Sequence, residues 1–146
     1  MDNSKRERLI LVIDDHHDHL AVIKQVLADS TIPCQVFTVS SGSQAIDFLR
    51  HRGDYQQAPR PDLILLDSHL SDGNGQTVLS EVKTDESLRR IPTIVLSPTA
   101  DRDSVINNYQ RQCNSYVMKP QDLIHLQDVM QVIESFWLNI VTLPSN

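Results

Sequence analysis

The stretch LILVIDD, residues Leu9 to Asp15, decides the fold because it joins five apolar residues directly to two carboxylates. A short run that is apolar at every position and rich in β-branched residues is typical of a strand buried on both faces, as in a parallel sheet. In such sheets, ligands bind beyond the carboxyl ends of the strands. The stretch therefore predicts a parallel α/β architecture and a polar site directly after its first strand.

The same strand-then-helix pattern recurs along the rest of the chain. Apolar residues at helical spacing predict a first helix over 18–28. Further strands are predicted at 36–39, 63–66, 93–96 and 116–118, and further helices at 43–50, 76–83, 101–112 and about 122–140. Five strands alternating with five helices favour right-handed crossovers and a doubly wound α/β fold with helices on both faces of the sheet.

Length and composition restrict the class of protein. A chain of 146 residues with 40% hydrophobic and 22% charged residues predicts a single domain, 1–146, with an extended C-terminal helix and tail over about 122–146. The net charge of −6 and the scattered basic residues argue against nucleic-acid binding.

The location is predicted from cysteines and hydropathy. Cys34 and Cys113 are far apart and lack metal-binding spacing, which suits a reducing compartment. The N-terminal MDNSKRER is charged, and no apolar run approaches the roughly 20 residues of a membrane span. We expect a cytoplasmic protein with no membrane contact.

Five chemically capable side chains follow the predicted strands. Asp14 and Asp15 follow the first, Asp67 the third, Ser97 the fourth and Lys119 the fifth. Because the carboxyl ends of parallel strands share one edge, these side chains should converge there. Three carboxylates repel one another unless a cation neutralises them, and hard oxygen ligands suit Mg²⁺.

The remaining groups of this cluster suit phosphoryl chemistry. Lys119 would place a positive charge on a phosphoryl oxygen, and Ser97 would donate a hydrogen bond to it. Asp67, alone at the tip of its strand, is then the candidate nucleophile.

At these residues the chain resembles the receiver domains of two-component response regulators. The motifs that carry the resemblance occur in family order: VIDD (12–15), LILLDSHL (63–70), IVLSP (94–98) and YVMKP (116–120). The resemblance implies a flavodoxin-like five-stranded parallel sheet of order 2-1-3-4-5. It also implies that Asp67 accepts a phosphoryl group from a histidine kinase, with at most intrinsic self-phosphorylation and autodephosphorylation as enzymatic activity.

The resemblance also assigns the other site residues. Asp14, Asp15, Asp67 and the backbone carbonyl of His69 would hold Mg²⁺, with Mn²⁺ as an alternative ion. Ser97 would move to the phosphoryl group, and Tyr116 would turn inward with it. The segments IESFWLNIVTLP (133–144) and RPDLILLD (60–67) resemble the small regulators paired with cyanobacterial phytochromes, which implies a phytochrome-type kinase.

Three positions depart from the family pattern. Ser71 and Asn74 stand where the family usually has proline and aspartate, while Gly75 is in place. Pro98 follows Ser97, where the family uses a backbone N–H to bind the phosphoryl group, and proline has no N–H. Losing one donor to a charged group costs roughly 1.5–3 kcal/mol. Pro98 therefore supports slower phosphorylation or a phosphate-independent scaffold.

Three histidines follow the acidic pair in the stretch IDDHHDHL (13–20). His16, His17 and His19 are separated by one, two and three positions, which should spread the rings around a helical turn. A transition-metal site normally has histidines four apart on one helix face. We therefore favour solvated polar residues over a dedicated metal site, with adventitious Ni²⁺ or Zn²⁺ binding left open.

The final helix carries a candidate output surface. Helical spacing predicts that one apolar stripe faces the sheet: Leu123, Leu126, Met130, Ile133, Trp137 and Ile140. Candidate interface residues are Val129, Val132, Phe136, Trp137 and Leu143. A wide buried face is the alternative, but we favour a homodimer whose output passes to an unidentified downstream protein.

Two other functions remain open. A Mg²⁺-dependent phosphohydrolase would place its nucleophile after the first strand in a DxD motif, which Asp14-Asp15-His16 does not provide. A receiver-like interaction scaffold that needs no phosphate is the stronger alternative, because Pro98 removes a phosphoryl donor.

Overall fold

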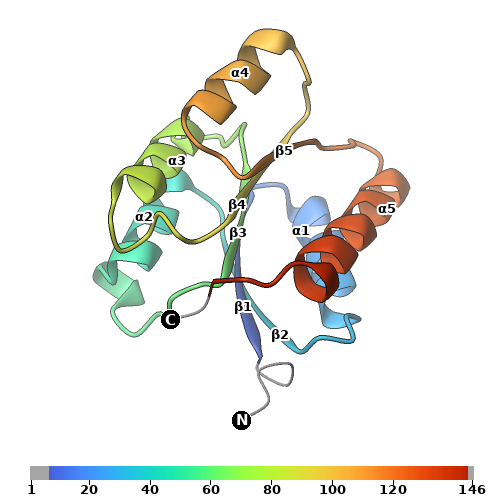
Figure 1. Ribbon diagram of the computed structural model, residues 1–146, viewed down its shortest axis with the longest axis horizontal. Coiled ribbons are helices and arrows are strands. Elements are labelled where there is room, and N and C mark those ends of the chain that lie inside the picture. Colours follow the sequence, from blue (N-terminus) through green and yellow to red (C-terminus); the bar gives the residue numbers. More distant parts are fainter. Residues whose placement is uncertain (1–6, 145–146) are drawn as a thin grey trace.

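Five parallel strands form the centre of the computed structural model, which describes residues 7–144 (Figure 1). The strands are β1 (Arg8–Ile13), β2 (Cys34–Val39), β3 (Leu63–Asp67), β4 (Thr93–Ser97) and β5 (Ser115–Met118). Their order is β2-β1-β3-β4-β5, and every neighbouring pair is parallel. The predicted fold class and strand order are confirmed.

Helices cover both faces of this sheet. They are α1 (His17–Ala28), α2 (Gly42–Arg50), α3 (Gly75–Thr84), α4 (Arg102–Gln110) and α5 (Leu123–Glu134). Helices α1 and α5 pack together on one face, α2 and α3 on the other, and α4 lies beside β5 (Figure 1). A short 3₁₀ helix, η2 (Gly53–Tyr55), follows α2, and a π-helix, η3 (Ser135–Ile140), continues α5.

Alternate residues of β1 explain why its sequence is apolar from Leu9 to Ile13. Leu11 and Ile13 enter the core on the α2–α3 side, whereas Ile10 and Val12 enter the core on the α1–α5 side. All four are almost completely buried. A strand covered on both faces has no position for a polar side chain until it ends, so the first polar residues follow Ile13.

Side-chain caps set the starts of two helices near the predicted positions. Asp101 accepts a hydrogen bond of 3.0 Å from the N–H of Ser104 and caps α4. Asp122 accepts from the N–H of Ile124 at 2.7 Å and caps α5. Each cap satisfies an N–H that the helix itself leaves unpaired.

The C-terminal end of the long helix differs from the prediction. Leu123 and Ile140 were expected to face the sheet but are exposed, whereas Leu138 and Leu143 are buried in the α1–α5 core. In η3 the hydrogen bonds run over five residues, as in the 2.8 Å bond from the N–H of Val141 to the carbonyl of Phe136. The wider turn of the π-helix shifts the buried position by one residue, from the predicted Trp137 to Leu138.

Two further predictions concern cysteines and membranes. Cys34 and Cys113 are free thiols, and burial raises the pKa of Cys34 to about 11. Within residues 7–144, no helix combines the length and hydropathy needed to cross a membrane. Residues 1–6 and the last two residues of the predicted tail, 145–146, lie outside the described part.

Candidate functional site

Strand register places two of the predicted carboxylates side by side. Ile13 is paired with Leu66, so the residues that follow, Asp14 and Asp67, are neighbours at the carboxyl end of the sheet. Both side chains are almost fully buried, although carboxylates are rarely buried without partners. Their partners therefore decide what the site can do.

Lys119 joins these two carboxylates. Its backbone N–H donates a bond of 2.6 Å to the carbonyl of Ser97, which fixes the end of β5 against β4. Its Nζ donates to Oδ2 of Asp14 at 2.6 Å and to Oδ2 of Asp67 at 3.2 Å. One ammonium thus sits between two carboxylates in a buried site.

Asp15 lies at the edge of the site and is held by a residue that departs from the family pattern. Its Oδ2 accepts hydrogen bonds from the backbone N–H of Ser71, at 2.7 Å, and from the Ser71 hydroxyl. Burial raises the pKa of Asp15, but the hydrogen bonds from Ser71 and the nearby charge of His16 outweigh it, so the pKa is lowered overall. A proline at position 71 could provide neither donor.

The loop after β3 is positioned by Asp67 itself. Oδ1 of Asp67 accepts a bond of 2.9 Å from the N–H of His69, the residue whose carbonyl was predicted to hold a metal. Gly75 begins α3 against this loop, and a Cβ there would lie 3.0 Å from the carbonyl oxygen of Ser68. A side chain at position 75 would therefore require the loop to shift by a few tenths of an ångström.

Ser97 and Tyr116 meet at the loop after β4. The Oγ of Ser97 is buried and accepts a 3.4 Å hydrogen bond from the N–H of Thr99. The hydroxyl of the half-buried Tyr116 donates a 2.7 Å bond to the carbonyl of the same Thr99. The two residues are thus connected through one loop residue, and Pro98 lies between the two ends of this connection.

His16 lies in the site rather than beside it, contrary to the prediction. Its Nδ1 is 3.1 Å from Oδ1 of Asp14, 3.2 Å from Oδ1 of Asp15 and 3.3 Å from Oδ2 of Asp67. The rings of His16 and His19 are stacked with their centroids 4.7 Å apart, so they are not spread around the turn. Of the three histidines in this stretch, His17 alone is both exposed and outside the two groups of possible metal ligands.

His19 was also expected to be solvated, but it is buried. Burial, followed by the positive charge of Lys119, lowers the pKa of His19 and favours the neutral imidazole. Residue spacing did not predict that His16 and His19 would lie near Asp14. Asp14 and His16 precede α1, and the helical period does not apply before the helix begins. The clue available in the sequence was their closeness to the acidic pair.

The donor set fits a divalent cation. Oxygen atoms of Asp14, Asp15 and Asp67 and a ring nitrogen of His16 lie within 4.8 Å of one another. Lys119 is one cationic group beside a cluster of three carboxyl groups, and such a cluster favours binding of a further cation. Carboxylate oxygens are the ligands that Mg²⁺ and Mn²⁺ take in proteins.

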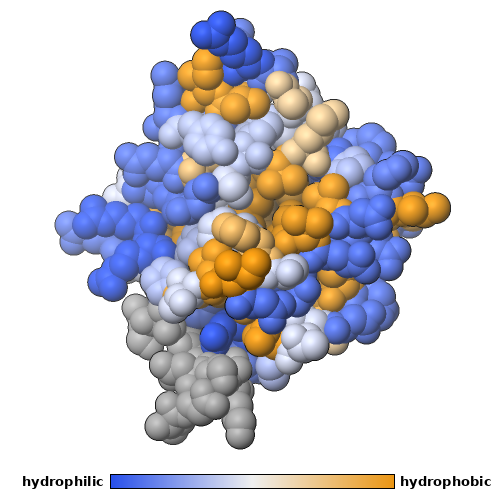
Figure 2. Space-filling view, turned by 45° about the vertical axis from the view of Figure 1, so that its right-hand side comes forward, coloured by the Kyte–Doolittle hydropathy of each residue, from blue (hydrophilic) through white to orange (hydrophobic). Residues whose placement is uncertain are grey.

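The predicted interface residues divide into exposed and buried groups. Val132 and Phe136 are exposed, Val129 and Trp137 are half-buried against the α1–α5 core, and Leu143 is buried within it. Leu143 is therefore not available on the surface, because the chain after η3 folds back against the core. Hydrophobic side chains are visible on the face that includes α5 (Figure 2).

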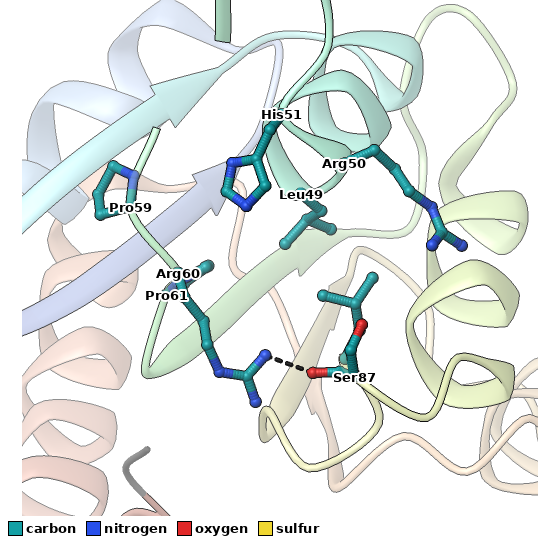
Figure 3. Close-up of a pocket in the computed structure, with 8 residues that line it drawn as sticks. Leu49, Arg50, His51, Pro59, Arg60, Pro61 and Ser87 are labelled. Carbon is teal, nitrogen blue, oxygen red and sulfur yellow. Dashed lines mark hydrogen bonds between the residues drawn. The ribbon is translucent and has the colours of Figure 1, made fainter. Parts of the chain in front are cut away.

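A separate pocket of about 340 Å³ is lined by residues that include Leu49, Arg60 and Pro61 (Figure 3). It lies at the opposite end of the sheet from Asp67. Pro61, which lines it, precedes β3, whereas Asp67 ends that strand. Arg60 reaches across to the carbonyl of Ser87, and Arg50 is paired with Glu81 on α3. The charged groups of this pocket are thus engaged in holding the fold, and the pocket is not connected with the acidic site.

Residues 10–131 match the family described as the response regulator receiver domain. Response regulator Rcp1 from Synechocystis sp. strain PCC 6803 is 39% identical over 144 residues, which cover 99% of this chain and 98% of Rcp1. The structure of the phosphorylated cyanobacterial phytochrome response regulator RcpA matches with a TM-score of 0.92 and 40% identity, covering 96% of this chain and 100% of the other. The Mn²⁺-bound form of Rcp1 matches with a TM-score of 0.90 and 39% identity, covering 94% and 99%.

Proposed function

Because the chain belongs to the family of response regulator receiver domains, we propose that it accepts a phosphoryl group on Asp67 from a histidine kinase. The observation that carries the proposal is the pair of contacts from Lys119 to Asp14 and Asp67 at the carboxyl end of the sheet. The similarity to Rcp1 and RcpA confirms the resemblance to cyanobacterial phytochrome regulators. A kinase of the phytochrome type is therefore the proposed phosphoryl donor.

The proposed transfer places each side chain in a defined role. A carboxylate oxygen of Asp67 attacks the phosphorus, the bond from phosphorus to the kinase's imidazole nitrogen breaks, and an acyl phosphate forms. Lys119 binds a phosphoryl oxygen and offsets its negative charge. Because Nζ of Lys119 already lies 3.2 Å from Asp67, the charge is in place before the phosphoryl group arrives.

A divalent cation is part of the proposal. Asp14, Asp15 and Asp67, with the backbone carbonyl of His69, would hold Mg²⁺, and Mn²⁺ would serve in its place. Bound there, the cation would neutralise and orient the phosphoryl oxygens. The Mn²⁺-bound form of Rcp1 and the acidic cluster of this chain support a divalent site.

Output would follow the connection between Ser97 and Tyr116. A phosphoryl group that draws the Ser97 hydroxyl away from Thr99 removes one of the contacts that hold the loop after β4. Tyr116 is bonded to the same Thr99, so its position would change together with the loop. The change would reach the face formed by α4, β5 and α5.

We further propose that this face forms a homodimer and contacts a downstream protein. Val132 and Phe136 are its exposed apolar centre, with Val129 and Trp137 at the margin. In this reading residues 1–146 act as one receiver domain, with an extended C-terminal helix and tail from about residue 122.

The test is intact-protein mass spectrometry after incubation with a small acyl phosphate, with Mg²⁺ and with chelator. A single phosphate adduct that needs both Mg²⁺ and Asp67 is expected. Asp67→Asn should abolish the adduct. Asp72→Asn is the matched control, because Asp72 lies in the same loop and bonds Ser43 and Asn74 rather than the site. Its adduct should equal that of the wild type.

A second function, a phosphate-independent scaffold, is favoured by one observation, the proline at position 98. It would be supported if neither the acyl phosphate nor a cognate kinase gave an adduct while the exposed α5 face still bound its partner.

A further inference from the structure

The Nδ1 atom of His16 has more close oxygen neighbours than one imidazole nitrogen can bond as a hydrogen donor. Carboxylate oxygens of Asp14, Asp15 and Asp67 lie 3.1, 3.2 and 3.3 Å away. One N–H can serve one of these acceptors well, and a neutral Nδ1 without hydrogen serves none. Ligand atoms about 2.1 Å from a shared ion lie roughly 3.0–3.4 Å apart. The 3.1 Å between Nδ1 of His16 and Oδ1 of Asp14 therefore fits two ligands of one ion.

His19, in the first turn of α1, provides a second, independent observation. It is 6% exposed, and its Nδ1 is buried with no hydrogen-bond partner among the described residues. A buried polar atom without a partner is costly, and each such atom in a native structure needs an explanation. One ring nitrogen of His19, one of His16 and a carboxylate oxygen of Asp14 lie within 4.8 Å of one another.

We propose that His16, His19 and Asp14 form a binding site for a first-row transition-metal ion of the Co²⁺, Ni²⁺ or Zn²⁺ class. The inference shares Asp14 with the magnesium site of the proposed function but depends on imidazole nitrogens, which Mg²⁺ does not favour. Imidazole suits Zn²⁺, Ni²⁺ and Cu²⁺, whereas carboxylate and water suit Mg²⁺ and Mn²⁺. A transition-metal ion bound by these residues competes with Mg²⁺ for Asp14.

The regulatory consequence follows from the shared carboxylate. Asp14 is also the partner of Lys119, so an ion held by the two histidines draws on a group that the phosphoryl site needs. Zn²⁺ at low concentration would then inhibit the Mg²⁺-dependent chemistry of Asp67. The inhibition would be competitive with Mg²⁺.

The test uses Zn²⁺ alone and Mg²⁺ alone as probes in calorimetric titrations of the full-length, tag-free chain. His16→Gln and His19→Gln should each weaken Zn²⁺ binding at least about tenfold, since even partners that only orient a metal ligand contribute 10–100-fold. For His19→Gln, whose ring is not among the donors grouped with Asp15 and Asp67, the Mg²⁺ affinity should change by less than threefold. His17→Gln is the matched control, because His17 is an exposed neighbour in the same stretch, and its Zn²⁺ affinity should equal that of the wild type.

A second measurement keeps the inference testable if His19→Gln fails to fold. In the wild type, one equivalent of Zn²⁺ should shift the imidazole ¹⁵N resonances of His16 and His19 and leave that of His17 in place, with His16→Gln and His17→Gln providing the assignments. Equal Zn²⁺ affinity in wild type and His16→Gln, or no shift of these two rings, overturns the inference. The phosphate adduct in Mg²⁺ is a separate readout, so failure of the zinc site and failure of the phosphoacceptor are distinguishable.

Discussion

Lys119 and Asp14 form a buried ion pair across the sheet, with Nζ and Oδ2 2.6 Å apart and both side chains 1% exposed. The pair connects the end of β5 with the end of β1, two strands that are not neighbours in the sheet. Removing one member of a buried pair leaves the other charge uncompensated, which costs about 3–5 kcal/mol.

We therefore expect Lys119→Met to lower the free energy of unfolding by about 3 kcal/mol in the absence of divalent cations. Urea denaturation with chelator present measures the change. Lys24→Met is the control, because Lys24 is exposed on α1 and should change the stability by no more than about 0.5 kcal/mol. Equal effects of the two substitutions would show that the buried pair does not stabilise the fold.

Restoring a backbone N–H at position 98 should favour the phosphorylated state. Pro98→Ala supplies the donor that proline lacks, and a hydrogen bond to a charged group contributes about 1.5–3 kcal/mol, or roughly 10–100-fold in an equilibrium constant. The rate and final yield of the Asp67 adduct should rise, as followed by mass spectrometry over time. Pro59→Ala, in the loop before β3, should leave both unchanged. A Pro98→Ala yield equal to the wild type would mean that another donor already replaces the missing N–H.

The proposed homodimer can be tested with two equally exposed residues of α5. Val132 is 69% exposed near the C-terminal end of the helix, and Ile124 is 71% exposed at its start. Val132→Asp should place a charge in the proposed interface and shift sedimentation toward the monomer, whereas Ile124→Asp should not. The same mass distribution for Val132→Asp and the wild type would remove α5 as the dimer surface.

Because of the π-helix, Leu138 rather than Ile140 should contribute to the stability of the C-terminal segment. Leu138 is 5% exposed and Ile140 is 70% exposed, although helical spacing predicts Ile140 on the buried stripe. Leu138→Ala should therefore destabilise the protein by about 2–5 kcal/mol. Ile140→Ala should change the stability by no more than about 0.5 kcal/mol. Urea denaturation of both variants distinguishes the two arrangements, since a regular α-helix would give the opposite order.

The sequence predicted the sheet but not the π-helical turn, because the strands depend on neighbouring residues whereas the turn depends on residues that pack later in the chain. In β1, burial on both faces requires four consecutive apolar residues, Ile10 to Ile13, and such a run is visible in the chain itself. The position of Leu138 instead depends on an extra residue in the helical turn, which the chain after it stabilises by packing Leu143 into the core. Hydrophobic periodicity alone does not distinguish an α-helix from a π-helix in the same segment of sequence.

The site shows the same division between local and long-range information. Asp14 and Asp67 could be placed because each follows a strand, and strand ends meet at one edge. Ser71 contacts Asp15 across 56 positions, so its role in holding that carboxylate depends on the course of the loop after β3. His16, the N-cap residue of α1, stacks on His19 in the first turn, a contact that depends on where the helix begins.

The contact between α2 and α3 should make stability depend on acidic pH through Asp85. Hydrogen bonds from the Ser87 hydroxyl, with the guanidinium of Arg50, lower the pKa of Asp85 from its ordinary 3.8 to about 2. A carboxyl group whose pKa is lower in the folded state stabilises the fold above its unfolded pKa, and loses that contribution as the pH falls through its folded pKa. The contribution of Asp85 is therefore complete above about pH 4 and disappears toward pH 2.

Asp85→Asn should accordingly be less stable than the wild type at pH 6, and the difference should shrink between pH 4 and pH 2. Urea denaturation at pH 6, 4, 3 and 2 measures the difference at each pH. Asp54→Asn is the matched control, because Asp54 is exposed in η2 and the structure records no ion pair for it among the described residues, so its difference should not vary with pH. If the Asp85→Asn difference also stayed constant down to pH 2, the effect of the substitution would not depend on ionisation, and the charge of Asp85 would not stabilise the α2–α3 contact.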